Sequence, residues 1–128
     1  MIRAKRIRRM FGGAMRQSGI LAAAGLYALD NHFSRLGEDH ENARLIAEKL
    51  AGVRGVELDL SKIQSNIVIF SLDEAMPDAG TIVERAKAEG VLLNEFGPRR
   101  VRAVTHLNVS REDCSQAGDI LARILEQK

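Results

Sequence analysis

The stretch that decides the fold is Asn66-Ile67-Val68-Ile69-Phe70, a β-branched and aromatic run that predicts a buried strand. Just before it, Val56–Leu60 alternates apolar and acidic residues, which is typical of a half-exposed strand. Gly52 and Gly55 separate this alternating segment from the helical pattern that precedes it. The middle of the chain is therefore expected to form two consecutive strands.

A helix and two further strands are expected after this pair. Met76-Pro77-Asp78 marks a turn and the start of a helix, which Gly90 ends. Val91–Leu93 and Val101–Leu107 are predicted to be strands, and the turn between them contains Gly97-Pro98. The predicted order is thus strand, strand, helix, strand, strand.

A last helix completes this order. Ser110 is expected to cap it, with Asp113 three residues on as an approximate capping box. Apolar residues then recur at helical spacing to the end of the chain. The predicted fold class is α+β: a β-β-α-β-β-α small domain over residues 53–128, with a mainly antiparallel sheet and helices on one face.

Two long helical patterns precede this domain, over residues 18–52. The first, over residues 18–36, begins with Ser18 as its expected N-cap and is alanine-rich and apolar over much of its circumference. Burial on more than one side is therefore expected for it. Residues 1–17 form a basic arm whose glycine pair, Gly12-Gly13, lets the backbone adopt a positive φ and approach another group closely.

The charge of the chain is divided unevenly. Residues 1–16 hold six basic residues and no acidic one, whereas the remainder holds 13 basic and 17 acidic residues. A basic arm on an acidic body suits nucleic acid, an anionic ligand or an acidic partner. Aromatic residues make up only 4% of the chain and Trp is absent, which argues against a surface that stacks nucleic-acid bases.

Composition also bears on location. No apolar run approaches the length needed to span a membrane, so no membrane partner is expected. Cys114 is the single cysteine, which precludes an internal disulfide and suits a reducing compartment, so we expect a cytoplasmic protein. Cys114 falls in a predicted helix with no base beside it, and we interpret it as ordinary packing.

Arg102 is the first candidate for chemistry in the C-terminal half. It lies inside a predicted strand between apolar neighbours, where a charge is costly unless it is paired. Its planar fork of donors could grip a substrate carboxylate. The alternative is a solvent-facing arginine or a structural ion pair. Arg99 and Arg100 beside it are interpreted as solvated turn residues.

The other candidate groups point to no site. His32, His40 and His106 fall in no ligand spacing with another His or Cys, so no metal is expected. No nucleophile-elbow motif is present, although sequence alone leaves a Ser/His/Asp triad open. Lys62 lies in a polar connector without apolar neighbours to desolvate its amine, so we interpret it as a surface lysine and not a Schiff-base lysine.

The chain resembles the low-specificity L-threonine aldolases, which are pyridoxal-phosphate enzymes of the aspartate-aminotransferase-like fold, fold type I. The matching segments cover nearly the whole chain in order and comprise residues 9–25, 38–43, 65–68, 97–99, 101–107 and 109–113. This resemblance implies the C-terminal third or so of an enzyme that cleaves L-threonine or L-allo-threonine to glycine and acetaldehyde.

The resemblance implies roles for three arginines. Arg102 matches the small-domain arginine expected to bind the α-carboxylate of the amino-acid substrate. Arg16, in Met-Arg-Gln, matches an arginine that reaches the phosphate of pyridoxal phosphate across a dimer interface. Arg9 stands near the same phosphate at a position that is often lysine, so its charge is kept and its geometry differs.

The resemblance also implies that the cofactor lysine lies upstream of the matching region, and none of the five lysines of this chain sits in such a motif. Because the aldimine makes the cofactor an electron sink for Cα–Cβ cleavage, the chain is expected to be inactive alone. Two other functions stay open. One is a non-catalytic oligomerisation or binding module derived from the small domain. The other is a basic-arm nucleic-acid binder, which salt-sensitive retention on DNA or RNA would support.

The apolar residues 18–36 lead to a prediction about association. We expect the chain to form a homo-oligomer, to associate with a separate N-terminal half or to be poorly soluble. The reason is that a large apolar surface is stable in water only when another surface covers it. Light scattering of the purified chain checks this. A monomer that persists at high protein concentration would contradict it.

Overall fold

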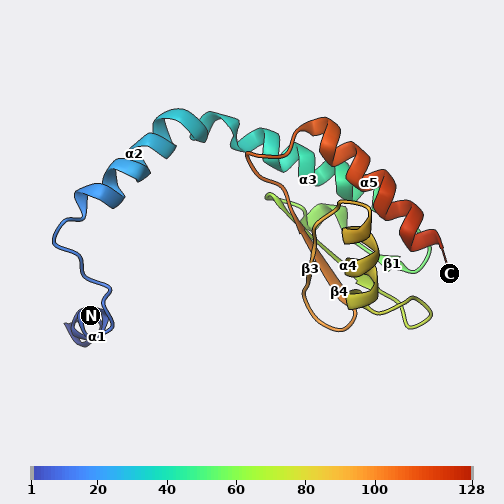
Figure 1. Ribbon diagram of the computed structural model, residues 1–128, viewed down its shortest axis with the longest axis horizontal. Coiled ribbons are helices and arrows are strands. Elements are labelled where there is room, and N and C mark those ends of the chain that lie inside the picture. Colours follow the sequence, from blue (N-terminus) through green and yellow to red (C-terminus); the bar gives the residue numbers. More distant parts are fainter. Residues whose placement is uncertain (1, 128) are drawn as a thin grey trace. The chain divides into compact units, whose positions relative to one another are not determined.

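The computed structural model describes residues 2–127. The chain divides between Ser34 and Arg35 into two compact units, which we call the N-terminal unit and the C-terminal unit (Figure 1). This boundary falls inside residues 18–52, where the sequence predicted two long helices before the small domain.

The C-terminal unit has a helix followed by the strand and helix order that the sequence predicted. From β1 onward the order is β-β-α-β-β-α, which confirms the α+β fold class. Its elements are α3 (Leu36–Leu50), β1 (Val56–Glu57), the 3-10 turn η2 (Leu60–Lys62), β2 (Ile67–Leu72), α4 (Ala79–Ala88), β3 (Asn94–Glu95), β4 (Arg100–Val104) and α5 (Arg111–Glu126).

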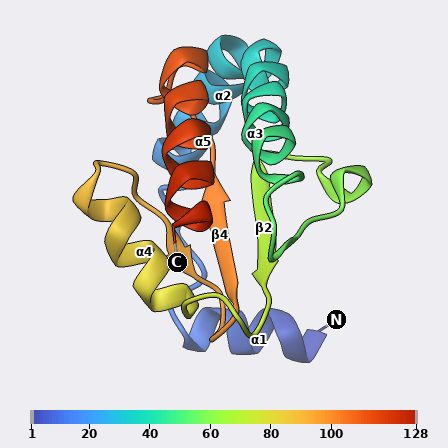
Figure 2. The ribbon, with the colours of Figure 1, turned by 90° about the vertical axis from the view of Figure 1, so that its right-hand side faces the viewer.

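The four strands form one antiparallel sheet in the order β1-β2-β4-β3. Because successive side chains of a strand point to opposite faces, the sheet has a buried face and an open face. The buried face carries the core side chains of the two central strands, namely Val68, Phe70, Leu72, Val101 and Ala103. Helices α3 and α5 lie side by side over this face, and α4 packs beside them (Figure 2).

Helices α3 and α5 approach each other closely at Gly118. A Cβ atom at this position would lie 2.7 Å from Cδ of Lys49 on α3, so only hydrogen fits there without displacing the lysine stem. The Lys49 ammonium donates to the carbonyl and hydroxyl oxygens of Ser115, both at 2.9 Å, and to Asp119 at 2.6 Å. The lysine stem therefore fills the interface while its charge stays paired on α5.

The predicted strand at Val91–Leu93 is wrong. These residues belong to no strand, and β3 begins only at Asn94. The reason is that these residues follow directly on the C-terminal cap of α4. In this cap Gly90 has φ +86° and the Val91 N–H donates to the Ala86 carbonyl at 2.9 Å. Because the helix end uses the Val91 N–H, Val91 cannot donate it to a strand, and pairing with β4 begins only at Asn94.

Two further strands are shorter than expected. β1 ends at Glu57 instead of Leu60, because the chain turns into η2, where the Asp59 side chain accepts from the Ser61 N–H. β4 ends at Val104 instead of Leu107. Beyond it the Thr105 N–H still donates to the Asn66 carbonyl at 2.9 Å, and side-chain hydrogen bonds of Thr105 and Asn66 add to this contact.

In the N-terminal unit, most of the basic arm is a helix, α1 (Ile2–Met10). Its end confirms the role expected of the glycine pair. Gly12 has φ +75°, and the N–H of Gly13 donates to the carbonyl of Arg8 at 2.8 Å. A Cβ atom at Gly13 would lie 2.6 Å from Cγ of Arg8, so this tight C-cap needs glycine at both positions.

The N-terminal unit continues with α2 (Gly19–His32) and the 3-10 turn η1 (Phe33–Arg35), which reaches the boundary between the units. Ser18 directly precedes α2 but its side chain makes no capping hydrogen bond, because its backbone is already helical. Within α1 and α2 no described residue is buried. Across residues 2–127, none of the helices has the length and apolar character that a membrane crossing requires.

The N-terminus of α5 generates a stability prediction. Ser110 and Asp113 form the predicted capping box: the Asp113 N–H donates to Ser110 Oγ, and the Ser110 N–H donates to Asp113 Oδ2 at 2.9 Å. Ser110 Oγ also donates to Asp113 Oδ2 at 2.7 Å, and this bond, followed by the one from the Ser110 N–H, holds the pKa of Asp113 below its usual value. Ser110→Ala should lower the free energy of unfolding by about 1 kcal/mol at pH 7, as measured by urea denaturation.

The pH dependence of this effect follows from its sign. A depressed pKa in the folded state means that the stabilisation is present above the ordinary carboxyl pKa and is lost as pH falls through the folded pKa. The difference between Ser110→Ala and the parent chain should therefore shrink in strong acid. Glu112→Gln, which removes a neighbouring charge without touching the box, is the control. A difference that grows as the pH is lowered would contradict the assignment.

Candidate functional site

The open face of the sheet carries a charge amid apolar side chains. Strand register places Arg102 of β4 between Ile69 on β2 and Asn94 on β3. In the adjacent row, Ile67 of β2 pairs with Val104 of β4. Ile67, Ile69 and Val104 are between 36% and 41% exposed, so no helix of this unit covers them. Arg102 thus stands on a partly apolar surface that lies opposite the helices.

The guanidinium of Arg102 is incompletely partnered. Its Nε is buried and has no hydrogen-bond partner within residues 2–127, and no ion pair to Arg102 forms among them. The structural ion pair that the sequence left open is therefore not formed in this part of the chain. The guanidinium charge therefore has no counter-charge within this part of the chain, and an anionic ligand at the terminal nitrogens would supply one.

Phe96, which directly follows β3, lies beside Arg102. The Cζ atom of Arg102 is 5.6 Å from the centroid of the Phe96 ring, and Cζ of Arg100 is 5.2 Å from the same centroid. Both distances are within the range of cation–π contacts. Arg100 is exposed, as expected, but it is the first residue of β4 and not a turn residue. Sequence reasoning did not single out Phe96, because an isolated Phe beside a Gly-Pro turn carries no signal of its own.

Arg99 lies in the turn, as expected, but the expectation that its guanidinium is simply solvated is wrong. Its guanidinium donates to the backbone carbonyls of Met76 at 2.6 Å, Pro77 at 3.2 Å and Glu74 at 3.3 Å. It therefore holds the loop that leads into α4. The local sequence could not distinguish Arg99 from Arg100, because these carbonyls lie 22 to 25 residues away along the chain.

The two other candidate arginines belong to the N-terminal unit. Arg9 is exposed in the last turn of α1, and Arg16 is exposed in the turn that precedes α2. In the described part of the chain, neither side chain takes part in an ion pair. Both cations are thus available to an external anion, and their role at a phosphate stays a prediction.

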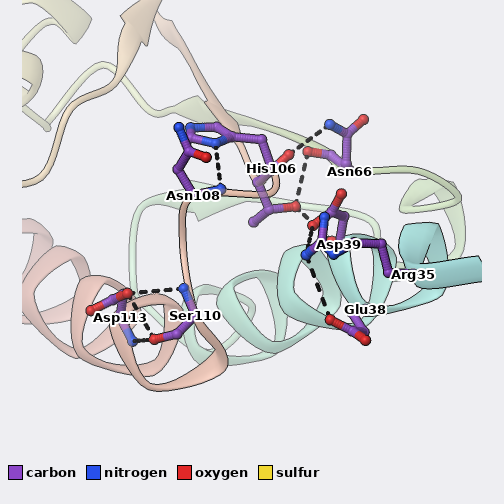
Figure 3. Close-up of polar contacts among 9 residues, drawn as sticks. Arg35, Glu38, Asp39, Asn66, His106, Asn108, Ser110 and Asp113 are labelled. Atoms are coloured by element: carbon purple, nitrogen blue, oxygen red, sulfur yellow. Dashed lines mark hydrogen bonds and ion pairs between the residues drawn. The ribbon is translucent and has the colours of Figure 1, made fainter. Parts of the chain in front are cut away.

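A hydrogen-bond network fixes the segment that follows Arg102 (Figure 3). The buried Thr105 donates through Oγ1 to the carbonyl of Asp39 at 2.6 Å, and Asn66 Nδ2 donates to the carbonyl of Thr105 at 2.7 Å. The Asp39 carboxylate accepts from Arg35 at 3.3 Å. Through these bonds the end of β4 is tied to β2 and to the first turn of α3.

His106 continues this network at the end of the strand. Its Nδ1 accepts a hydrogen bond from the Asn108 N–H at 3.2 Å, so the imidazole supports the turn toward α5 (Figure 3). His106 thus lies two residues after β4 with one ring nitrogen hydrogen-bonded. Within residues 2–127, no cluster of His, Cys, Asp and Glu could hold a metal ion.

The surroundings of the described lysines do not suit an attachment site for pyridoxal phosphate. Lys49 is engaged with α5, and Lys62 is 81% exposed beside Asp59 at 3.3 Å. Lys5 and Lys87 are exposed on helices, and Lys128 lies outside the described residues. A Schiff-base lysine needs a desolvated amine, so the described lysines do not fit this role.

Cys114 does not add a nucleophile to the site. It is 3% exposed in the core, and burial raises the pKa of its thiol, with the nearby Asp113 carboxylate acting in the same direction. A thiol with a raised pKa is a poor nucleophile near neutral pH. Its packing role, as interpreted from the sequence, agrees with this environment.

Comparison with solved structures defines the class of fold. The structure of DesI in the presence of its TDP-sugar product matches with a TM-score of 0.65 and 23% identity, over 83% of this chain and 35% of DesI. The structure of MppP soaked with 2-ketoarginine matches with a TM-score of 0.62 and 19% identity, over 78% of this chain and 30% of MppP. At these identities the likeness concerns the fold alone, which is one found in fold type I pyridoxal-phosphate enzymes.

Sequence comparison gives the family. The family model described as beta-eliminating lyase matches residues 1–73, and the chain belongs to this family. It is 46% identical to the low specificity L-threonine aldolase of Escherichia coli K12 over 114 residues, covering 89% of this chain and 32% of that enzyme. Against low-specificity L-threonine aldolase 1 of Arabidopsis thaliana the identity is 30% over 112 residues, covering 87% and 31%. The resemblance expected from the motifs is confirmed, and the chain spans about a third of the length of the curated relatives it matches.

The contrast between the two neighbouring arginines generates a prediction. Arg99→Met should lower the free energy of unfolding by about 2 kcal/mol, because it removes charge-assisted hydrogen bonds to carbonyls of the loop before α4. Arg100→Met is the matched control and should change it by about 0.5 kcal/mol or less, since Arg100 is exposed. Urea denaturation of the two variants checks this, and equal destabilisation would refute the distinction.

Proposed function

We propose that this chain is the substrate-carboxylate-binding part of a pyridoxal-phosphate-dependent threonine aldolase that cleaves L-threonine or L-allo-threonine to glycine and acetaldehyde. The observation that carries the proposal is Arg102, whose buried Nε has no partner among residues 2–127 and whose side chain lies on the open face of the sheet. The names of the relatives, at up to 46% identity, support the reaction class.

Arg102 is suited to the α-carboxylate by geometry and by surroundings. A guanidinium presents parallel N–H groups that match the two oxygens of a carboxylate. Ile69 and Val104 beside it reduce the effective dielectric, which strengthens the attraction between the two charges. The role of Arg102 is therefore to bind and orient the amino acid. When bound, the cofactor supplies the electron sink for cleavage of the Cα–Cβ bond.

Arg16 and Arg9 are proposed to bind the phosphate of the cofactor. Both are exposed cations of the N-terminal unit. The paired N–H groups of a guanidinium can bind two oxygens of a phosphate, just as they bind the two oxygens of a carboxylate. We further propose that the enzyme is cytoplasmic and acts as a homo-oligomer or together with a separate N-terminal half. Since the described lysines do not fit the covalent link, the lysine that binds the cofactor would come from outside the described residues.

A second candidate function is a non-catalytic oligomerisation module. The observation that favours it is the apolar surface of α2 and η1, where six large side chains are each between 60% and 70% exposed: Ile20, Leu21, Leu26, Tyr27, Leu29 and Phe33. Such a surface marks a contact with another chain. This function and the first differ in whether Arg102 recognises a carboxylate.

The test is a titration of the purified chain, followed by the Nε–Hε resonance of Arg102 in ¹⁵N NMR spectra. L-threonine should shift this resonance saturably and L-threonine methyl ester should not, because the ester lacks the carboxylate. Arg102→Gln should abolish saturable binding. Arg44→Gln, which removes an exposed arginine paired with Glu48, is the matched control and should leave it unchanged. Equal responses to the acid and the ester would contradict the proposal.

A second arm tests the role of the lysines. The chain is mixed with pyridoxal phosphate, reduced with borohydride and weighed intact, while release of acetaldehyde from L-threonine is followed in parallel. We expect no stoichiometric lysine adduct and no acetaldehyde. A stable aldimine on one lysine would show that the chain holds its own attachment site.

A further inference from the structure

We infer that Phe96 is a positioning residue for Arg102: its ring holds the guanidinium so that the terminal nitrogens, and not Nε, meet a carboxylate. The inference rests on the proposed function of Arg102 and adds a residue that neither the sequence motifs nor the family resemblance assigned. It is carried by the contact between the ring and the guanidinium and by the burial of Nε.

The backbone anchors the ring in place. The Phe96 N–H donates to the Arg100 carbonyl at 2.9 Å, which ties Phe96 to β4 two residues before Arg102. Arg100 and Arg102 are separated by one residue of a strand, so their side chains emerge on the same face of the sheet. The ring of Phe96 therefore meets both guanidiniums, with Cζ atoms 5.2 and 5.6 Å from its centroid.

The burial of Nε determines which nitrogens of Arg102 can bind a ligand, and hence what the Phe96 ring must position. Nε is the one nitrogen of this side chain that is both fully buried and unpartnered in the described structure. It cannot reach a ligand from outside, so a carboxylate must be bound by the terminal nitrogens. A ring against the guanidinium compensates part of the cost of the buried Nε through the attraction between a cation and the aromatic face.

Preorganisation explains why this matters for binding. An arginine side chain has many rotamers, and fixing them when a ligand binds reduces the affinity. The Phe96 ring fixes the guanidinium before the ligand arrives, so this cost is already met in the free chain. Arg100 on the same ring adds a second positive charge near the carboxylate, which favours an anion and disfavours a cationic ligand.

The test uses the full chain with L-threonine as the probe. Phe96→Leu should raise the dissociation constant about two- to fivefold, the effect of losing one partly exposed cation–π contact. It should also move the Arg102 Nε–Hε resonance of the free chain, because the ring no longer shields it. Phe96→Tyr keeps the ring and should restore both values. Phe11→Leu, a change at an exposed phenylalanine of the N-terminal unit, is the matched control and should alter neither.

The outcomes separate this inference from the function on which it rests. Parent-like affinity in Phe96→Leu, with binding lost in Arg102→Gln, would overturn the positioning role and leave the proposed function standing. Unchanged binding in Arg102→Gln would instead overturn the proposed function. Equal weakening in Phe96→Leu and Phe96→Tyr would overturn the positioning role, since the ring would not then be what matters. Phe96→Met, which keeps the bulk without a ring, replaces Phe96→Leu if that variant does not fold, and is expected to bind as weakly.

Discussion

The pairing of β2 with β4 is the constraint on which the rest of the structure depends. These are the longest strands, and their register from Ile67 opposite Val104 to Ser71 opposite Arg100 divides every side chain between two faces. Val68, Phe70, Val101 and Ala103 go to the core under α3 and α5, and Arg102 goes to the open face. Core and candidate site are thus two consequences of one set of backbone hydrogen bonds.

The open face is held still by contacts on the other side of the sheet. Thr105, buried three residues after Arg102, bonds to the first turn of α3, while Lys49 fixes α3 against α5 above Gly118. A ligand at Arg102 therefore meets a strand whose end and whose covering helices are both fixed. This rigidity suits a residue that orients a substrate, because small displacements of a binding group weaken its geometry.

The sequence predicted the parts of the structure that depend on local pattern. The strand and helix order, the cap at Ser110 and the turn at Gly12-Gly13 follow from periodicity, capping chemistry and backbone freedom, which neighbouring residues determine. The strand pattern singled out Arg102, the resemblance to threonine aldolases implied its role, and the structure adds the unpartnered Nε.

What could not be predicted depends on distant partners. Arg99 and Arg100 are identical neighbours with different roles, because carbonyls 22 to 25 residues away select only Arg99. The role proposed for Phe96 depends on its contacts with Arg100 and Arg102 of β4, which the residues next to Phe96 in the sequence do not reveal. No strand forms at Val91–Leu93 because the Val91 N–H takes part in the C-terminal cap of α4, and pairing with β4 begins only at Asn94.

The alternation of charge along β4 has a consequence for folding fidelity. If β4 slipped by one residue against β2, Arg100 and Arg102 would turn into the core and Val101 and Ala103 would turn outward. Burying two unpaired guanidiniums costs more free energy than any new contacts of the shifted strand could supply. The two arginines of the open face therefore destabilise the shifted register of β4 against β2, and this effect does not depend on any ligand they bind in the folded sheet.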